Sequence, residues 1–170
     1  LDGRYERHLR TVRSIVGVRE GARDLSALSM LISGNGMTFF TDTYVSIDPT
    51  AEELAEMTLL AAEEIRRFGV EPKAALLSHS NFGSRDSASA AKMRRAVEIL
   101  HAAQPELCVD GEMHADSALN PELRARVLPH SILEGEANLL VFPNLDAANI
   151  SLGIVRTMMD ALHVGPILLG

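Results

Sequence analysis

The chain has 170 residues, of which 46% are hydrophobic and 23% are charged. This length is enough for one domain with a sizeable core, and the composition excludes a disordered segment. Sixteen Lys and Arg residues stand against twenty-three Asp and Glu residues, which gives a formal net charge of -7. Because no basic block is interleaved with aromatic residues, we expect no nucleic-acid partner.

Cysteine content and hydropathy indicate in which cellular compartment the protein is expected. Cys108 is the single cysteine, which excludes a disulfide or a thiolate zinc site within one chain and favours a reducing compartment. No apolar run approaches the roughly 20 residues that cross a bilayer, and the charged amino terminus does not resemble a signal peptide. We therefore expect a cytoplasmic protein without membrane contact. Since the chain starts at Leu1 rather than at Met and stops on an apolar stretch, we also expect a fragment of a longer protein.

The amino-terminal part of the chain predicts a hairpin between two helices. The apolar stretches 27–33 and 37–45 flank Asn35-Gly36, a dipeptide that supplies the positive φ of a tight hairpin turn. Thr50 and Glu53 form a capping-box pattern at the start of an apolar helical repeat. The predicted elements are a helix over 4–16, an antiparallel hairpin over 27–45 and a helix over 50–69.

From Lys73 onward, short apolar stretches alternate with helical patterns. We predict strands over 74–77, 107–109, 138–142 and 165–170. The helices predicted between them run from Ala90 to near Pro105, over 117–127 and over 147–162. Such alternation favours parallel strands joined by right-handed crossovers. The predicted fold class is therefore α/β, with a mostly parallel sheet flanked by helices and an antiparallel hairpin at its edge.

Polar residues follow three of the predicted strands, where open α/β sheets bind ligands. The segment 78–86 offers hydroxyls, an amide and the N–H groups at a helix start, which together suit an anion, with Arg85 as a counter-charge. The alternative is that Ser84 and Asp86 only cap the helix. The segment is not a P-loop, because no Gly-Lys-Ser/Thr follows its glycine.

The second polar strand end carries four potential metal ligands at alternate positions: Asp110, Glu112, His114 and Asp116. An extended segment would place them on one face. Gly111 and the helix start that follows break this geometry, so surface and capping roles are favoured over a metal site.

At the third strand end, either Asn144 contacts a polar ligand or Asp146 caps the following helix. The chain contains no Gly-x-Ser-x-Gly elbow, and its Ser/His pairs lack an orienting acid, so hydrolase chemistry is not supported. The residues by themselves predict an α/β domain that binds an anionic small molecule.

Four motifs, in this order, resemble the phosphate acetyl/butyryl transferase family, and the match covers nearly the whole chain. They are Leu76–Ser84, Asp110–Asp116, Phe142–Ile150 and Gly165–Gly170. The residues in these motifs are most similar to those of the carboxy-terminal domain of hybrid NADP-dependent malic enzymes. Asn81 stands where a transferase usually has Thr, and Asp-Gly-Glu-Met-His replaces the common Asp-Gly-Glu-Leu-Gln.

The resemblance implies the middle, inserted domain of the phosphotransacetylase or isopropylmalate dehydrogenase-like fold. Residues 1–170 would be a single domain, without the amino-terminal lobe and without the carboxy-terminal segment that carries the family's catalytic Ser-Arg. In such malic enzymes this domain resembles a regulatory module that binds acetyl-CoA and helps to assemble a homo-oligomer. Oxidative decarboxylation of malate to pyruvate, with NADP and a divalent metal, then occurs in other domains of the parent protein.

No catalytic residue, cofactor or metal is expected in this chain itself. Two alternatives stay open: part of an active phosphate acetyltransferase, and a structural oligomerisation domain that has lost its ligand. The resemblance and the polar strand ends together predict a cleft for acetyl-CoA or phosphate. Its candidate residues are Arg10, Ser80, Asn81, Gly83, Ser84, Glu112, Asn144 and Asn149.

Overall fold

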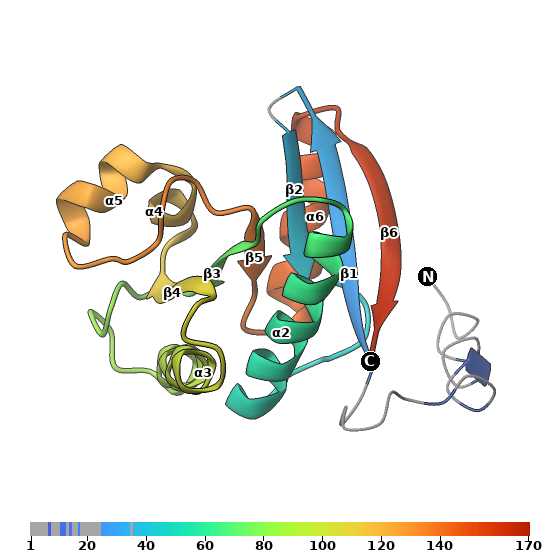
Figure 1. Ribbon diagram of the computed structural model, residues 1–170, viewed down its shortest axis with the longest axis horizontal. Helices are drawn as coiled ribbons and strands as arrows, with labels where there is room; N and C mark the ends of the chain where they lie inside the picture. The colour runs from blue at the N-terminus through green and yellow to red at the C-terminus, as the bar shows by residue number, and fades with distance from the viewer. Residues whose placement is uncertain (1–6, 8–10, 13, 15–16, 18–24, 35) are drawn as a thin grey trace.

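The computed structural model describes residues 7, 11, 12, 14, 17, 25–34 and 36–170. These residues form a six-stranded sheet with helices on both faces (Figure 1). The described residues of the predicted first helix, 7, 11, 12 and 14, are helical, whereas the candidate site residue Arg10 lies outside the described residues. No helix in the described part of the chain is long and apolar enough to cross a membrane.

The sheet confirms the predicted fold class. Its strands are β1 (Ser26–Ser33), β2 (Gly36–Thr41), β3 (Lys73–Leu77), β4 (Cys108–Met113), β5 (Leu139–Val141) and β6 (Leu162–Leu169). Their order across the sheet is β4-β3-β5-β2-β1-β6. The neighbours from β4 to β2 are parallel, and β1 pairs antiparallel with both β2 and β6. Among the described strands, β1 therefore runs against all the others.

The predicted position of the hairpin at the edge of the sheet is wrong. β6 occupies that edge and pairs with β1, so β1 is hydrogen-bonded on both sides. The reason is visible in β1 itself, because its residues from Ser26 to Leu31 are all buried and its apolar side chains face both ways. An uncovered edge would leave the backbone groups of such a strand without partners.

The helices are α2 (Ala51–Arg67), α3 (Ala88–Ala103), α4 (Ala115–Leu119), α5 (Pro121–Val127) and α6 (Leu145–Met158). The predicted capping box of α2 is confirmed: Glu53 N donates to Thr50 Oγ1 at 3.2 Å, and Thr50 N donates to Glu53 Oε2 at 2.7 Å. The single helix predicted over 117–127 is divided into α4 and α5. Pro121 has no N–H to continue α4, and Asn120 caps α5 instead.

Strand residues alternate between two helical layers. Phe39, Leu76 and Leu139 belong to a cluster with residues of α2 and α3. Phe40, Leu77 and Leu140 belong to a second cluster with residues of α4 and α6. Figure 1 shows α2 in front of the sheet and α6 behind it. Since both faces of the sheet are covered, consecutive strand residues are apolar, as is typical of parallel sheets.

The segment between β4 and β5 is held by Arg124, which is only 4% exposed. Its Nη1 donates to the carbonyls of Ser117 and Ala118 at 2.9 and 3.2 Å, and its Nη2 donates to Leu133 O at 3.0 Å and to Gly135 O. The guanidinium therefore joins the last turn of α4 to the loop that precedes β5. The negative end of a helix dipole favours a cation at this place.

We predict that Arg124→Lys lowers the free energy of unfolding by about 3 kcal/mol, because an ammonium group lacks the planar fork and leaves buried carbonyls without a donor. Urea denaturation measures the change. Arg126→Lys on the same helix is the control, and there the expected change is within about 0.5 kcal/mol because Arg126 is exposed. Equal effects of the two substitutions would contradict this role of Arg124.

Candidate functional site

The candidate site lies at the carboxyl edge of the parallel strands. Since β2, β5, β3 and β4 run parallel, the loops that follow them emerge at one edge of the sheet. The segment 78–87 follows β3, His114 follows β4, and Pro143-Asn144 follows β5. The sheet thus brings together the three polar strand ends that the sequence singles out.

The segment 78–87, here called the β3–α3 loop, is held by hydrogen bonds from its backbone N–H groups to its own serine hydroxyls and to Glu112. Every N–H from Ser80 to Arg85 donates to an acceptor within the protein, at 2.8 to 3.2 Å. The N–H groups of residues 80–85 are therefore occupied within the protein. The exposed side chains of this loop include those of Ser84 and Arg85.

Glu112 holds the β3–α3 loop from the end of β4. Its side chain is 0% exposed, and its Oε1 accepts from Gly83 N at 2.8 Å and from Arg94 Nη1 at 2.9 Å. Its backbone oxygen accepts from Phe82 N at 2.9 Å. Its Oε2 is buried and has no hydrogen-bond partner among the described residues. Glu112 therefore lies behind the loop and positions it, with the Arg94 guanidinium as counter-charge.

The two residues before Glu112 also have structural tasks. Asp110 Oδ2 accepts from Ser131 Oγ at 2.6 Å and from Ile132 N at 2.8 Å. Gly111 has φ +144°, and a Cβ there would lie 2.7 Å from Leu76 O, so only glycine fits between β4 and β3. The described residues include no group of three or more His, Cys, Asp or Glu side chains that could hold a metal ion. The predicted surface and capping roles are wrong for Asp110 and Glu112, because both carboxylates are buried and hold neighbouring segments.

Ser80, Asn81 and Ser84 complete the β3–α3 loop. Ser84 Oγ accepts from Asn81 N at 2.9 Å and lies 3.4 Å from Ser80 Oγ. Asn81 Oδ1 accepts from His114 N at 2.8 Å. The loop after β3 is thereby joined to the loop after β4. Ser80, Asn81 and Ser84 thus form one hydrogen-bonded group, and Gly83 and Glu112 form a second one beside it.

The residues that cap α3 and α6 differ from the capping residues that the sequence suggested. Ser87, and neither Ser84 nor Asp86, caps α3 by accepting from the backbone N–H three residues later at 3.1 Å. Asn144, and not Asp146, caps α6 in the same way at 2.9 Å. In each helix, the capping side chain is the one directly before the first helical residue.

Asn144 and Asn149 lie near the loop after β2. Asn149 Nδ2 donates to Thr43 O at 3.2 Å. Lys92 Nζ, on α3, bonds Asp48 Oδ1 at 2.6 Å and Pro143 O at 2.8 Å. Lys92 and Asn144 both line a hollow of about 430 Å³ between the start of α3 and the start of α6.

Sequence reasoning missed Lys92, Arg94 and Asp42. Asp42 is buried, and its carboxylate accepts from the N–H groups of residues 44, 45 and 46 at 2.8 to 3.0 Å, which shapes the loop after β2. A polar residue at a strand end was a signal for Asp42. Lys92 and Arg94 carried no comparable signal, because charged side chains on an amphipathic helix usually face solvent.

Comparison with known proteins identifies the family. Residues 1–170 match the family model for phosphate acetyl/butaryl transferase. The chain is 66% identical over 170 residues to an NAD-dependent malic enzyme of Rhizobium meliloti (strain 1021) and 52% identical over 170 residues to an NADP-dependent malic enzyme of Haemophilus influenzae (strain ATCC 51907 / DSM 11121 / KW20 / Rd). All of this chain is covered in both alignments, but it spans only 22% of the length of each relative.

Solved structures show the same relation. A phosphotransacetylase from Streptococcus pyogenes superimposes with a TM-score of 0.90 at 36% identity, over 95% of this chain and 50% of that chain. The sequence match over every residue and the shared fold agree. The chain belongs to the phosphate acetyl/butaryl transferase family.

Proposed function

We propose that this chain is a regulatory acetyl-CoA-binding and oligomerisation domain of a malic enzyme. Oxidative decarboxylation of malate to pyruvate then takes place in other domains of that enzyme. The observation that carries the proposal is the degree of relatedness. Identity is 66% to a malic enzyme of which the chain spans 22%, against 36% to the phosphotransacetylase from Streptococcus pyogenes.

In this proposal, the nucleotide and the divalent metal that malate decarboxylation needs bind to the other domains of the enzyme. NADP is the nucleotide expected from the sequence resemblance. The two malic enzymes compared above are named for NAD and for NADP respectively. This domain is therefore proposed to serve either kind of enzyme, and a cytoplasmic location stays a prediction.

The chemistry of the site supports an anionic ligand such as the phosphates of acetyl-CoA. Arg85 follows Ser84 on the exposed part of the β3–α3 loop. Lys92 lines the hollow at the start of α3, where it pairs with Asp48 and where Asp146 also lies. Guanidinium and ammonium groups form the strongest hydrogen bonds to phosphate oxygens. Because Glu112 already fixes the loop, a ligand does not have to order it.

An active phosphate acetyltransferase is the second candidate function. The phosphotransacetylase match favours it, since this chain spans 50% of that protein. The family's catalytic Asn-Asp-Leu-Ser-Arg-Gly motif, known here from the resemblance, does not occur in these 170 residues. Release of CoA from acetyl-CoA and phosphate by the purified protein would favour the transferase. Its absence, together with inhibition of malate oxidation by acetyl-CoA, would favour the regulatory domain.

We predict that Arg85→Gln in the full-length enzyme raises the acetyl-CoA concentration for half-inhibition of malate oxidation about tenfold, because one charge-assisted hydrogen bond to phosphate is lost. The thermal midpoint should stay unchanged, since the Arg85 side chain is exposed. Arg95→Gln is the matched control on α3, where Arg95 pairs with Glu98 in solvent. Overlapping inhibition curves for the two variants and the wild type would contradict the prediction.

Ser84→Ala and Asn81→Ala separate binding from structure at the same loop. Both side chains accept loop hydrogen bonds, so each substitution should lower stability by about 1 kcal/mol. If the loop also binds acetyl-CoA, inhibition should weaken in parallel. Lower stability with an unchanged inhibition curve would make the loop a structural element and remove it from the proposed site.

The oligomerisation part of the proposal depends on α6 and β6. Ile150, Ile154 and Met158 are 60%, 53% and 81% exposed and recur every four residues, which places them on one helix face. Met159 and Leu162 extend this apolar surface towards β6, the edge strand. A contiguous apolar patch on a folded protein marks an interaction surface. We propose that the same face of a second copy covers it, as in a twofold interface.

We predict a dimer or larger species for the wild-type protein and a reduced mass for Ile154→Glu, because a carboxylate would be buried in the shared apolar face. Multi-angle light scattering measures both. Ile132→Glu is the control, since Ile132 is similarly exposed at 59% but lies in the loop before β5. A monomeric wild type at high protein concentration would contradict the proposal, and so would equal effects of the two substitutions.

A further inference from the structure

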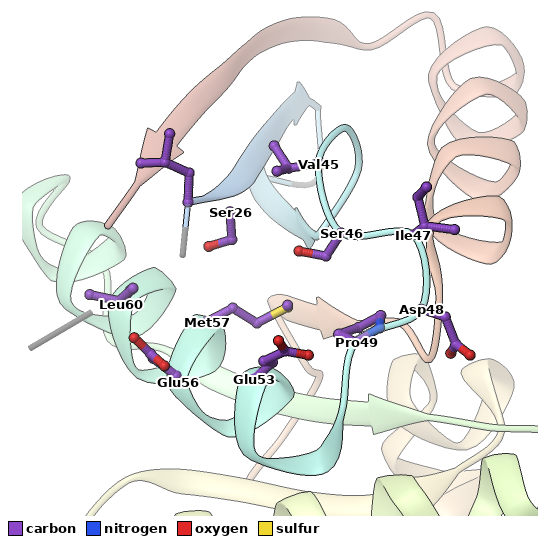
Figure 2. Close-up of a pocket in the computed structure, with 11 residues that line it drawn as sticks. Ser26, Val45, Ser46, Ile47, Asp48, Pro49, Glu53, Glu56, Met57 and Leu60 are labelled. Carbon is purple, nitrogen blue, oxygen red and sulfur yellow. The ribbon is translucent and has the colours of Figure 1, made fainter. Parts of the chain in front are cut away.

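A separate hollow of about 320 Å³ opens between the start of β1, the loop after β2 and the first turns of α2 (Figure 2). Its volume is in the range of small-molecule sites. None of the candidate residues for the anionic ligand that the structure describes lines it. It therefore needs an explanation of its own.

The environment of Ser26 indicates that this hollow binds a ligand. It lines the cavity and is only 4% exposed, and its Oγ has no hydrogen-bond partner among the residues that the structure describes. Figure 2 shows the hydroxyls of Ser26 and Ser46 on one side of the hollow, facing α2. A buried hydroxyl without a partner is unfavourable. A donor that enters the hollow would remove this penalty.

The charged side chains in the lining determine which charge a ligand in this hollow should carry. Glu53 and Glu56 line the hollow, and its described lining includes neither Lys nor Arg. Asp48 also lines it, but its carboxylate pairs with Lys92 Nζ at 2.6 Å. Figure 2 shows Glu53 and Glu56 along the same side of α2, across from the two serines. Glu53 Oε2 accepts from Thr50 N, yet a carboxylate can accept further hydrogen bonds. The Glu53 carboxylate thus favours a cation over an anion in this hollow.

The rest of the lining is apolar. Met57 and Leu60 on α2 and Val45 in the loop after β2 contribute aliphatic or thioether surface. An inorganic cation would gain little from such walls, whereas an alkyl chain would bury its surface against them.

We propose that this hollow binds a small alkylammonium ion. Its N–H groups donate to Ser26 Oγ and to the Glu53 carboxylate, and its alkyl chain packs on Met57 and Leu60. The inference does not depend on the proposed acetyl-CoA site, which takes a ligand of opposite charge at another part of the strand edge.

Isothermal titration of the purified protein with n-butylammonium chloride tests the proposal. We expect saturable binding of one ion per chain, with sodium chloride replacing the probe in the reference titration. Sodium butyrate, which has the same chain length and the opposite charge, should give no saturable binding. Absence of saturable n-butylammonium binding, or equal binding of butyrate, would overturn the proposal.

Two neighbouring carboxylates provide matched variants. Glu53→Gln removes the charge at the hollow, and glutamine at this position can keep the capping box, so α2 should still form. It should weaken n-butylammonium binding about tenfold or more. Glu52→Gln removes the same charge one residue earlier, at an exposed position that does not line the hollow, and should change binding less than about twofold. Equal effects would reveal general charge attraction and overturn the proposal.

Ser26→Ala tests the second contact without a change of charge. It should weaken binding severalfold while the thermal midpoint stays equal to or above that of the wild type, because an unpartnered buried hydroxyl is removed. Unchanged n-butylammonium affinity in this variant would overturn the role of Ser26.

Discussion

The arrangement of the candidate site depends on one buried carboxylate. Glu112 has no exposed surface, and a buried charge is tolerated only when it is paired and hydrogen-bonded. Its Oε1 meets the Gly83 amide in the loop after β3 and the Arg94 guanidinium on α3. A single side chain at the end of β4 thereby fixes two other elements. The outer face of the loop, with Ser84 and Arg85, is held in one position from behind.

Electrostatics divides the carboxyl edge of the sheet into two regions. The chain has a net charge of -7, yet Arg85 and Lys92 gather near the start of α3. The carboxylates of Glu53 and Glu56 lie on α2, beyond the loop after β2. The Lys92–Asp48 pair, with 2.6 Å between Nζ and Oδ1, stands between the two regions. The two hollows share Ile47 and Asp48 in their linings, so the Lys92–Asp48 pair lies at the boundary between the proposed anion site and the proposed cation site.

Local signals predicted most of the elements, and non-local contacts explain the rest. The capping box at Thr50 depends on neighbours in the sequence, so the pattern was sufficient. The predicted turn residue Asn35 lies outside the described residues. The pairing of β6 with β1 joins residues far apart in the chain, and no local pattern contains it. The Asn120-Pro121 pair was a readable local signal for the break between α4 and α5. At the site, the motif resemblance selected Glu112, but its bond to Arg94, eighteen residues away, required the folded structure.

Hydrogen exchange of the β3–α3 loop in a Glu112→Gln variant is the most direct test of whether this carboxylate holds the loop in position. We predict that the amide of Gly83 exchanges about tenfold faster or more, because its charge-assisted bond to Oε1 is weakened. The neighbouring amide of Phe82, which donates to the Glu112 backbone oxygen, should lose protection with it, while the amides of β3 and β5 keep theirs. Glu98→Gln, an exposed carboxylate on α3, should leave the loop unchanged. Wild-type exchange rates at Phe82 and Gly83 in the Glu112→Gln protein would contradict the account.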